Sequence, residues 1–210
     1  MIKTQTAVPM GFTGETFPAG THMCLVYSDD AERLESIAKF LEAGILNNEK
    51  VGYFADAAPP DEIKKALLGH MSAGAARSDG AKLDVRTARD VYCPKGRFVP
   101  GEMLDTLRGF YDSAVEEGYG NARASGEMSW ALKGIPGSDR LVEYEALIND
   151  LIVTHPLTPI CQYNANLFDG ATILNILKVH PMMIVHGQVV RNPYYQEPRE
   201  FFKTYAGNTR

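Results

Sequence analysis

Six polar or aromatic residues lie at or just after the ends of three segments that the sequence predicts to be strands. They are Tyr27, Glu127, Trp130, Gln162, Tyr163 and Asn164. In an open parallel sheet, ligands bind beside the carboxyl ends of the strands. An aromatic wall that carries a few polar groups suits a small, weakly polar organic molecule. The pattern therefore predicts a small-molecule site at this edge, to which the thiols of Cys24 and Cys161 could add soft sulfur contacts.

Each of these residues also has a structural interpretation. At the ligand edge, Glu127 could accept hydrogen bonds from a ligand, or act as a general base if burial raised its pKa. It could instead cap the turn after its strand or pair with Arg123. A tryptophan such as Trp130 is equally at home in a core, and an asparagine such as Asn164 often shapes a turn. The sequence leaves these alternatives open.

His22 and Cys24 are two residues apart on one predicted strand, so both side chains point to the same face and could share a ligand or a metal. A zinc site needs four protein ligands, or three and a water. The other candidate ligands are scattered and have no ligand spacing; they are Cys93, Cys161, His180 and His186. The sequence therefore predicts no metal and no cofactor, and it leaves open whether His22 and Cys24 belong to the core.

The turn after the first predicted strand bears on nucleotide binding. A phosphate loop needs glycines, a lysine for the phosphates, and a serine or threonine for magnesium. Residues 27–32 instead read Tyr-Ser-Asp-Asp-Ala-Glu. Carboxylates at a helix N-terminus stabilise it by about 0.3–1 kcal/mol each, but they occupy the positive end that a phosphate would need. We therefore expect that this protein is not an enzyme. The alternative hypothesis is a RecA-like nucleotide-binding protein or hydrolase that uses Glu127 as its base.

Alternating strands and helices must position these residues. The sequence predicts strands at 22–27, 50–55, 83–87, 121–125 and 159–163, helices at 30–46, 59–70, 100–117, 141–152 and 169–179, and a hairpin-like segment at 182–190. Residues 72–80, rich in Gly, Ala and Ser, predict a mobile loop. This order is typical of an α/β fold in three layers, with a mostly parallel central sheet covered on both faces.

Length and composition suggest one such domain. We expect an irregular lead-in over 1–20, a single α/β domain over 21–196 and a tail over 197–210. The net charge of -5 provides no basic field for nucleic acid or an anionic membrane. The sequence contains neither a membrane-spanning run nor a signal peptide, and its three scattered cysteines suit a reducing environment. We therefore expect a cytoplasmic protein.

Several motifs occur in a characteristic order. They are His22-x-Cys24-x-x-Tyr27 with the acidic helix start after it, and the segments 49–53, 126–131, 143–145, 161–164, 180–181 and 192–195. Together they resemble the MEDS family, the sensory domain of methanogen and methylotroph signalling proteins and of the dichloromethane-dehalogenase repressor. The resemblance extends over about residues 20–196.

This resemblance implies a RecA-like or KaiC-like core with a degenerate phosphate loop. It also implies a non-catalytic sensory function in a prokaryotic signalling or transcription-regulation system, with a small organic ligand such as a hydrocarbon derivative. Domains of this kind usually lie beside a kinase or a DNA-binding domain. Because the 210 residues contain neither, we expect a signalling protein or a second copy of the chain to be the partner.

Overall fold

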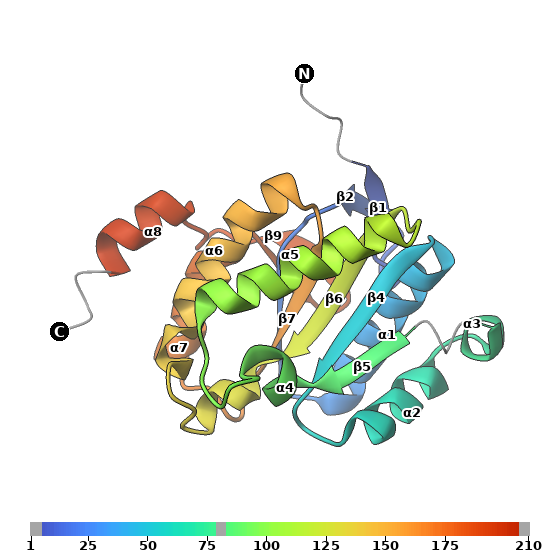
Figure 1. Ribbon diagram of the computed structural model, residues 1–210, viewed down its shortest axis with the longest axis horizontal. Coiled ribbons are helices and arrows are strands. Elements are labelled where there is room, and N and C mark those ends of the chain that lie inside the picture. The colour runs from blue at the N-terminus through green and yellow to red at the C-terminus, as the bar shows by residue number, and fades with distance from the viewer. Residues whose placement is uncertain (1–5, 79–82, 206–210) are drawn as a thin grey trace.

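A computed structural model describes residues 6–78 and 83–205, and it contains a seven-stranded central sheet (Figure 1). The strand order is β5-β4-β6-β7-β3-β8-β9. Their bounds are β3 Met23–Tyr27, β4 Glu49–Ala55, β5 Leu83–Thr87, β6 Asn121–Glu127, β7 Thr158–Asn164, β8 Met182–Val185 and β9 Gln188–Arg191. All neighbours are parallel except β8 and β9, which confirms the mostly parallel sheet expected from the sequence.

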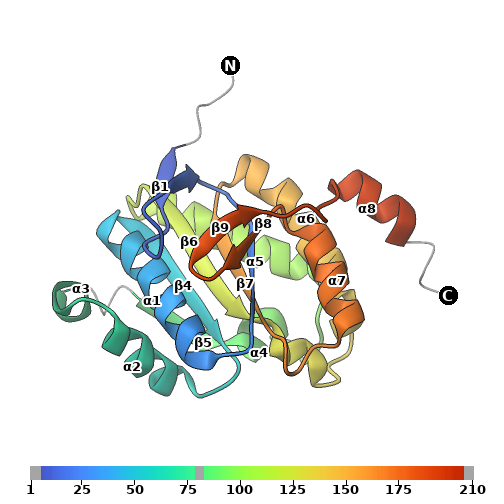
Figure 2. The ribbon, with the colours of Figure 1, turned by 180° about the vertical axis from the view of Figure 1, so that it is seen from behind.

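Helices cover both faces of this sheet (Figures 1 and 2). On one face lie α1 Asp30–Leu46, α2 Pro60–His70 and the short α3 Ala73–Ser78, and on the other lie α5 Pro100–Glu116, α6 Leu141–Thr154 and α7 Gly170–Val179. The five-residue α4 Ala88–Tyr92 follows β5, and α8 Pro198–Tyr205 packs against α6 and α7. Two separate apolar clusters fill the two interfaces, so the expected three layers are present. Among the described helices, none has the length and apolar character needed to cross a membrane.

Side-chain alternation in β7 assigns neighbouring residues to opposite faces. Cys161 and Tyr163 pack in the cluster beneath α5 and α6, whereas Ile160 packs in the cluster beneath α1. Gln162 also faces α1, because it accepts a hydrogen bond from the Arg33 side chain of that helix. This alternation is inherent in a pleated strand. Two residues next to each other in β7 therefore cannot line the same side of the sheet.

Two turns form as their residue types predict. The Asp29 carboxylate caps α1 by accepting a hydrogen bond from the Glu32 backbone N–H at 2.9 Å, so the helix starts at Asp30 as expected. The β8–β9 hairpin turns at His186 and Gly187, whose φ angles are +47° and +68°. Two left-handed residues form the tight turn that best matches the twist of a hairpin. The predicted hairpin is thereby confirmed.

Two segments near the ends of the described chain are more ordered than the sequence suggested. Residues 6–20 carry a small antiparallel pair, β1 Ala7–Pro9 and β2 Thr16–Pro18, and the nearby Met10 is fully buried in the cluster beneath α1. The expected tail carries α8, whose Phe201 is buried against the other cluster. Strands of three residues are too short for a visible period. In the segment 72–80, where a loop was expected, residues 73–78 are helical, and residues 79 and 80 lie outside the described part of the chain.

Candidate functional site

The structure divides the predicted site residues between the two faces of the sheet. Cys24, Trp130, Cys161 and Tyr163 lie in the apolar cluster beneath α5 and α6. The others lie on the α1 face or at the strand ends; they are Tyr27, Glu127, Gln162 and Asn164. These eight residues therefore cannot line one common pocket, contrary to the prediction from the sequence. The physical reason is that consecutive strand residues alternate in direction.

Trp130 is a core residue. Its side chain is fully buried, its ring stacks on Tyr92 with centroids 4.9 Å apart, and it also contacts the ring of Phe98 at 4.8 Å. It lies in a 3-10 turn, Met128–Leu132, directly after β6. Of the two interpretations that the sequence left open for Trp130, the structure favours packing.

A cavity of about 230 Å³ opens at the carboxyl end of β3. Residues of β3, of the first turns of α1 and of the β8–β9 hairpin line it, among them Leu25, Tyr27, Arg33, Ser36 and Ile184. Its position agrees with the rule that ligands of open α/β sheets bind beyond the carboxyl strand ends. Among the predicted site residues, Tyr27 is the one that lines this cavity directly.

Arg33 is the functional candidate that the sequence analysis missed. It is 1% exposed, and its Nη1 donates hydrogen bonds to the Tyr53 hydroxyl at 2.7 Å, Glu127 Oε1 at 2.9 Å and Gln162 Oε1 at 3.0 Å. Its Nε donates to the exposed carboxylate of Asp30 at 2.8 Å. Its Nη2 is buried and has no hydrogen-bond partner among the described residues. The sequence did contain a signal for this role. Arg33 lies one helical turn before the apolar stripe that begins at residue 37, and this spacing turns its side chain toward the core.

Glu127 is bound on both of its oxygens. Oε1 accepts hydrogen bonds from Arg33 and from the Tyr53 hydroxyl, and Oε2 accepts them from the backbone N–H groups of Asp56 and Ala57. A carboxylate has about four lone-pair sites, and four donors fill them here. Burial raises the pKa of Tyr53 well above its usual range, so this partner stays a neutral donor. Glu127 has no free lone pair with which to take a proton from water.

The partner of Glu127 differs from the one that the sequence suggested. Arg123, the expected partner, instead forms a buried bidentate pair with Glu49, with both distances 2.6 Å. Arg33 belongs to the first turns of α1, whereas Arg123, in β6, contacts the second half of that helix by donating to the backbone carbonyl of Phe40. The expected capping role is present, but the capped turn is the one that follows β4, at residues 56 and 57.

The turn between β3 and α1 is filled by carboxylates. Asp29 caps the helix, and Asp30 and Glu32 lie in its first turn. One backbone donor at this helix N-terminus, the N–H of Glu32, thus binds a protein carboxylate, and the local charge repels anions. Glu32 lies at the cavity, while Arg33 is the cation in its wall. The degenerate phosphate loop expected from the sequence is present in this form.

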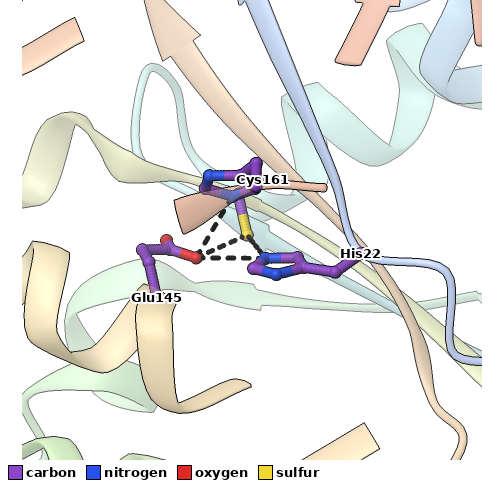
Figure 3. Close-up of side chains that lie close together, drawn as sticks. His22, Glu145 and Cys161 are labelled. Carbon is purple, nitrogen blue, oxygen red and sulfur yellow. Dashed lines mark hydrogen bonds and ion pairs between the residues drawn. The ribbon is translucent and has the colours of Figure 1, made fainter. Parts of the chain in front are cut away.

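On the opposite face, the fold brings together residues that are scattered in the sequence. The ligand atoms of His22, Glu145, Cys161 and His180 all lie within 4.8 Å of one another, and all four side chains are buried. Figure 3 shows the first three of them side by side. Cys24 lies on the same face but outside this group, and burial raises its pKa to about 12. The sequence could not predict the cluster, because its members come from the start of β3, the middle of α6 and β7, and the end of α7.

Burial sets the charge state of the cluster. It lowers the pKa of His22 to about 4 and raises that of the Cys161 thiol well above its usual range. Burial therefore favours a neutral imidazole at His22 and a protonated thiol at Cys161, both beside the buried side chain of Glu145.

The sequence and the fold were compared with known proteins. Residues 21–181 match the family model described as MEDS, the MEthanogen/methylotroph, DcmR Sensory domain. The transcriptional repressor DcmR of Methylorubrum extorquens is 28% identical over 163 residues, which are 76% of this chain and 57% of the repressor. The chain thus spans less than two thirds of the length of that relative.

Two solved structures from archaea share the fold. A KaiC-like protein of Pyrococcus horikoshii superimposes with a TM-score of 0.59 at 13% identity, covering 85% of this chain and 79% of that one. The flagellar accessory protein FlaH of Methanocaldococcus jannaschii gives 0.58 at 13% identity, covering 92% of both chains. At this identity the likeness concerns the fold alone, and it confirms the KaiC-like core. Because the family model matches most of its length, the chain belongs to the MEDS family of sensory domains.

Proposed function

We propose that this chain is a non-catalytic sensor in a prokaryotic signalling or transcription-regulation system, and that it binds a small uncharged organic molecule in the cavity at the end of β3. Membership of a sensory family and likeness to a transcriptional repressor support the regulatory role. The observation that carries the ligand proposal is the wall of the cavity. It combines apolar strand residues with one buried cation, Arg33, that has an unpartnered Nη2.

The charges around the cavity favour a neutral ligand. The guanidinium of Arg33 is already paired with Glu127 and Asp30, and Glu32 adds a further carboxylate at the cavity. An anionic ligand would meet more negative than positive charge at this wall. A neutral molecule with one hydrogen-bond acceptor, such as an alcohol, a ketone or an ether, could bind Nη2 and place its carbon atoms against Leu25 and Ile184.

Ligand binding can alter the surface through the side chains around Nη2. The half-buried ring of Tyr27 lies 5.2 Å from the guanidinium carbon of Arg33, so an acceptor that reaches Nη2 would displace neighbouring side chains. The β8–β9 hairpin lines the same cavity and exposes Val185 and Val190. We propose that this hairpin carries the change to a signalling protein or to a second copy of the chain. A ligand shifts such an equilibrium only by its difference in affinity for the two conformations.

The competing function is nucleotide hydrolysis with Glu127 as base, which the KaiC-like fold brings into consideration. Two observations weigh against it. Four donors occupy the Glu127 carboxylate, and the turn before α1 presents Asp29 and Asp30 where phosphates would need donors. Purified protein with ATP and magnesium should show no turnover. Turnover that Glu127→Gln abolishes would contradict the sensor proposal.

A thermal-shift panel tests ligand binding directly. Small alcohols, ketones, ethers and haloalkanes are compared with carboxylates and with ATP. A ligand at 100 times its Kd stabilises the native state by about 2.7 kcal/mol, which corresponds to a rise of about 5–10 °C in Tm at this chain length. A neutral compound should give such a rise, and the anions should not.

Two variants locate the response. Ser36→Leu fills the cavity and should remove the shift, whereas Ala131→Ser, outside the residues that line the cavity, should retain it. A shift that survives Ser36→Leu unchanged would place the ligand elsewhere. If no neutral compound in the panel stabilises the protein, the chain is better explained as a scaffold without a ligand.

A further inference from the structure

Four buried side chains converge on one point between the sheet and helices α6 and α7 (Figure 3). His22 precedes β3, Cys161 lies in β7, Glu145 lies in α6, and His180 caps the end of α7. We propose that these four residues bind a divalent metal ion in a tetrahedral site, and that Zn²⁺ is the ion that fits them best. This site is separate from the cavity of the proposed sensor function, because it lies on the other face of the sheet.

Four of the six distances between the donor atoms are close to the edges of a zinc tetrahedron. Glu145 Oε2 lies 3.3 Å from His22 Nε2, 3.4 Å from His180 Nε2 and 3.2 Å from Cys161 Sγ. Cys161 Sγ lies 3.6 Å from His22 Nε2, and the remaining two pairs are within 4.8 Å. Zinc bonds of about 2.0–2.3 Å place neighbouring ligands of a tetrahedron about 3.3–3.7 Å apart. Four pairs thus already have nearly this spacing, and binding of an ion would set the two remaining distances, both of which involve His180 Nε2.

His180 presents a bare nitrogen to the centre of the group. Its Nδ1 lies 2.8 Å from the backbone carbonyl oxygen of Ile176, which can only accept a hydrogen bond. In the neutral ring the proton therefore resides on Nδ1, and Nε2 carries a lone pair. That Nε2 is buried and has no hydrogen-bond partner in the described part of the chain. A lone pair that faces a carboxylate is unfavourable unless a proton or a metal cation lies between them.

His22 is oriented in the same way by Asn149. Its Nδ1 lies 3.2 Å from Asn149 Oδ1, and Asn149 Nδ2 donates to the backbone carbonyl of Val179 at 2.8 Å. The second contact fixes which end of the amide faces His22, so Nδ1 must be the donor and Nε2 again presents a lone pair. Metal-ligating histidines almost always donate their other ring N–H to such a partner.

Glu145 supplies the negative charge. Its Oε1 accepts a hydrogen bond from the Tyr163 hydroxyl at 2.6 Å, which leaves Oε2 for the centre of the group. Among the described residues, its ion-pair partners are the two histidines rather than a lysine or an arginine. A buried carboxylate needs a compensating charge, and a divalent cation would provide it.

The donor set selects the ion. Two imidazole nitrogens, a sulfur and one carboxylate oxygen suit Zn²⁺, whereas Mg²⁺ and Ca²⁺ prefer oxygen ligands alone. On binding, the zinc–sulfur bond replaces the S–H bond of Cys161, and the thiol proton leaves to solvent. Because the protein supplies all four ligands and buries them, the site is of the closed structural type. It would tie α6 and α7 to the start of β3 and to β7.

The experiment compares the whole chain with two cysteine variants, all purified without a histidine tag from zinc-supplemented cultures. Cys161→Ser removes the proposed sulfur ligand, and Cys24→Ser is the matched control, because Cys24 is buried on the same face opposite Cys161. Metal analysis should find one zinc ion per chain in the wild type and in Cys24→Ser. Most of this zinc should be lost in Cys161→Ser.

Cobalt substitution provides a readout that does not depend on the folding of a variant. Wild-type protein depleted with a chelator and reloaded with Co²⁺ should show a thiolate-to-cobalt charge-transfer band and the intense visible bands of tetrahedral cobalt. Cys24→Ser should give the same spectrum. Wild-type protein that contains no metal, gives no such spectrum and has the same Tm with and without Zn²⁺ would overturn the proposal, leaving a plain hydrogen-bonded core cluster. Equal zinc content in Cys161→Ser would also overturn the four-ligand site.

Discussion

The guanidinium of Arg33 and the carboxylate of Glu127 form a buried ion pair, 2.9 Å long, that links the first turns of α1 to the end of β6. The two residues are 94 positions apart, and both side chains are almost completely buried. Removing one partner of such a pair leaves the other charge uncompensated. The pair therefore serves both the stability of the sheet edge and the charge balance of the cavity.

Glu127→Gln should lower the free energy of unfolding by about 3–5 kcal/mol, because it removes the buried partner of Arg33 and leaves only the exposed carboxylate of Asp30. Urea denaturation monitored by circular dichroism measures this change. The control is Glu35→Gln, which removes the exposed Glu35–Lys39 pair on the same helix and should change stability very little. Equal effects of the two substitutions would contradict the structural role of the buried pair.

Gly44 gives a prediction about the other end of α1. An added Cβ there would lie 2.5 Å from the Cδ and Nε atoms of Arg123, which Glu49 and the carbonyl of Phe40 hold in place. Gly44→Ala should therefore destabilise the protein by about 1–3 kcal/mol despite the better helix propensity of alanine.

Gly109, in α5, is the matched control because an added Cβ meets nothing within 4 Å. Gly109→Ala should stabilise by roughly 0.5–1 kcal/mol. Opposite signs for Gly44→Ala and Gly109→Ala in thermal unfolding are the expected result. The same sign for both would mean that Arg123 is free to move.

The N-terminal strands should contribute to stability. Met10 follows β1 and is completely buried against α1, so Met10→Ala should cost about 2–5 kcal/mol. Thr16, exposed on β2, is the comparison, and Thr16→Ala should leave Tm close to that of the wild type. If Met10→Ala behaves like Thr16→Ala, the segment does not pack on the domain in solution.

Tyr163→Phe tests the surroundings of the proposed zinc site without removing a ligand. The substitution deletes only the hydroxyl that donates to Glu145 Oε1. Loss of such a supporting hydrogen bond typically weakens metal affinity by about 10–100-fold. Competition with a chromophoric chelator measures the affinity. The control is Tyr144→Phe, at another buried tyrosine of the apolar cluster beneath α5 and α6, and it should retain the wild-type zinc affinity.

Much of the fold could be predicted from the sequence because its elements carry clear local signals. The start of α1 at Asp30 follows from the cap at Asp29, and the β8–β9 turn follows from Gly187 beside His186. Strands β1 and β2 and helix α8 escaped prediction, since they are short and are stabilised mainly by packing on the rest of the chain.

The candidate sites were less predictable because they depend on long-range contacts. The position of Tyr27 at the end of a predicted strand was enough to place it at the carboxyl edge of the sheet. The sequence did not indicate that the side chain of Arg33 would form a buried ion pair with Glu127. Likewise, nothing in the spacing of His22, Cys161 and His180 indicates that helices α6 and α7 bring them together around Glu145. Chemistry assembled from four separate elements has no local signature.

The two faces of strand β7 contribute side chains to two different polar groups of residues. Its Gln162 serves the polar network under the cavity, while Cys161 and Tyr163 serve the histidine cluster behind it. A one-residue insertion or deletion within this strand would exchange the two sides, sending an amide toward the histidines and a thiol toward the arginine. Neither centre can therefore be shifted along β7 without disturbing the other.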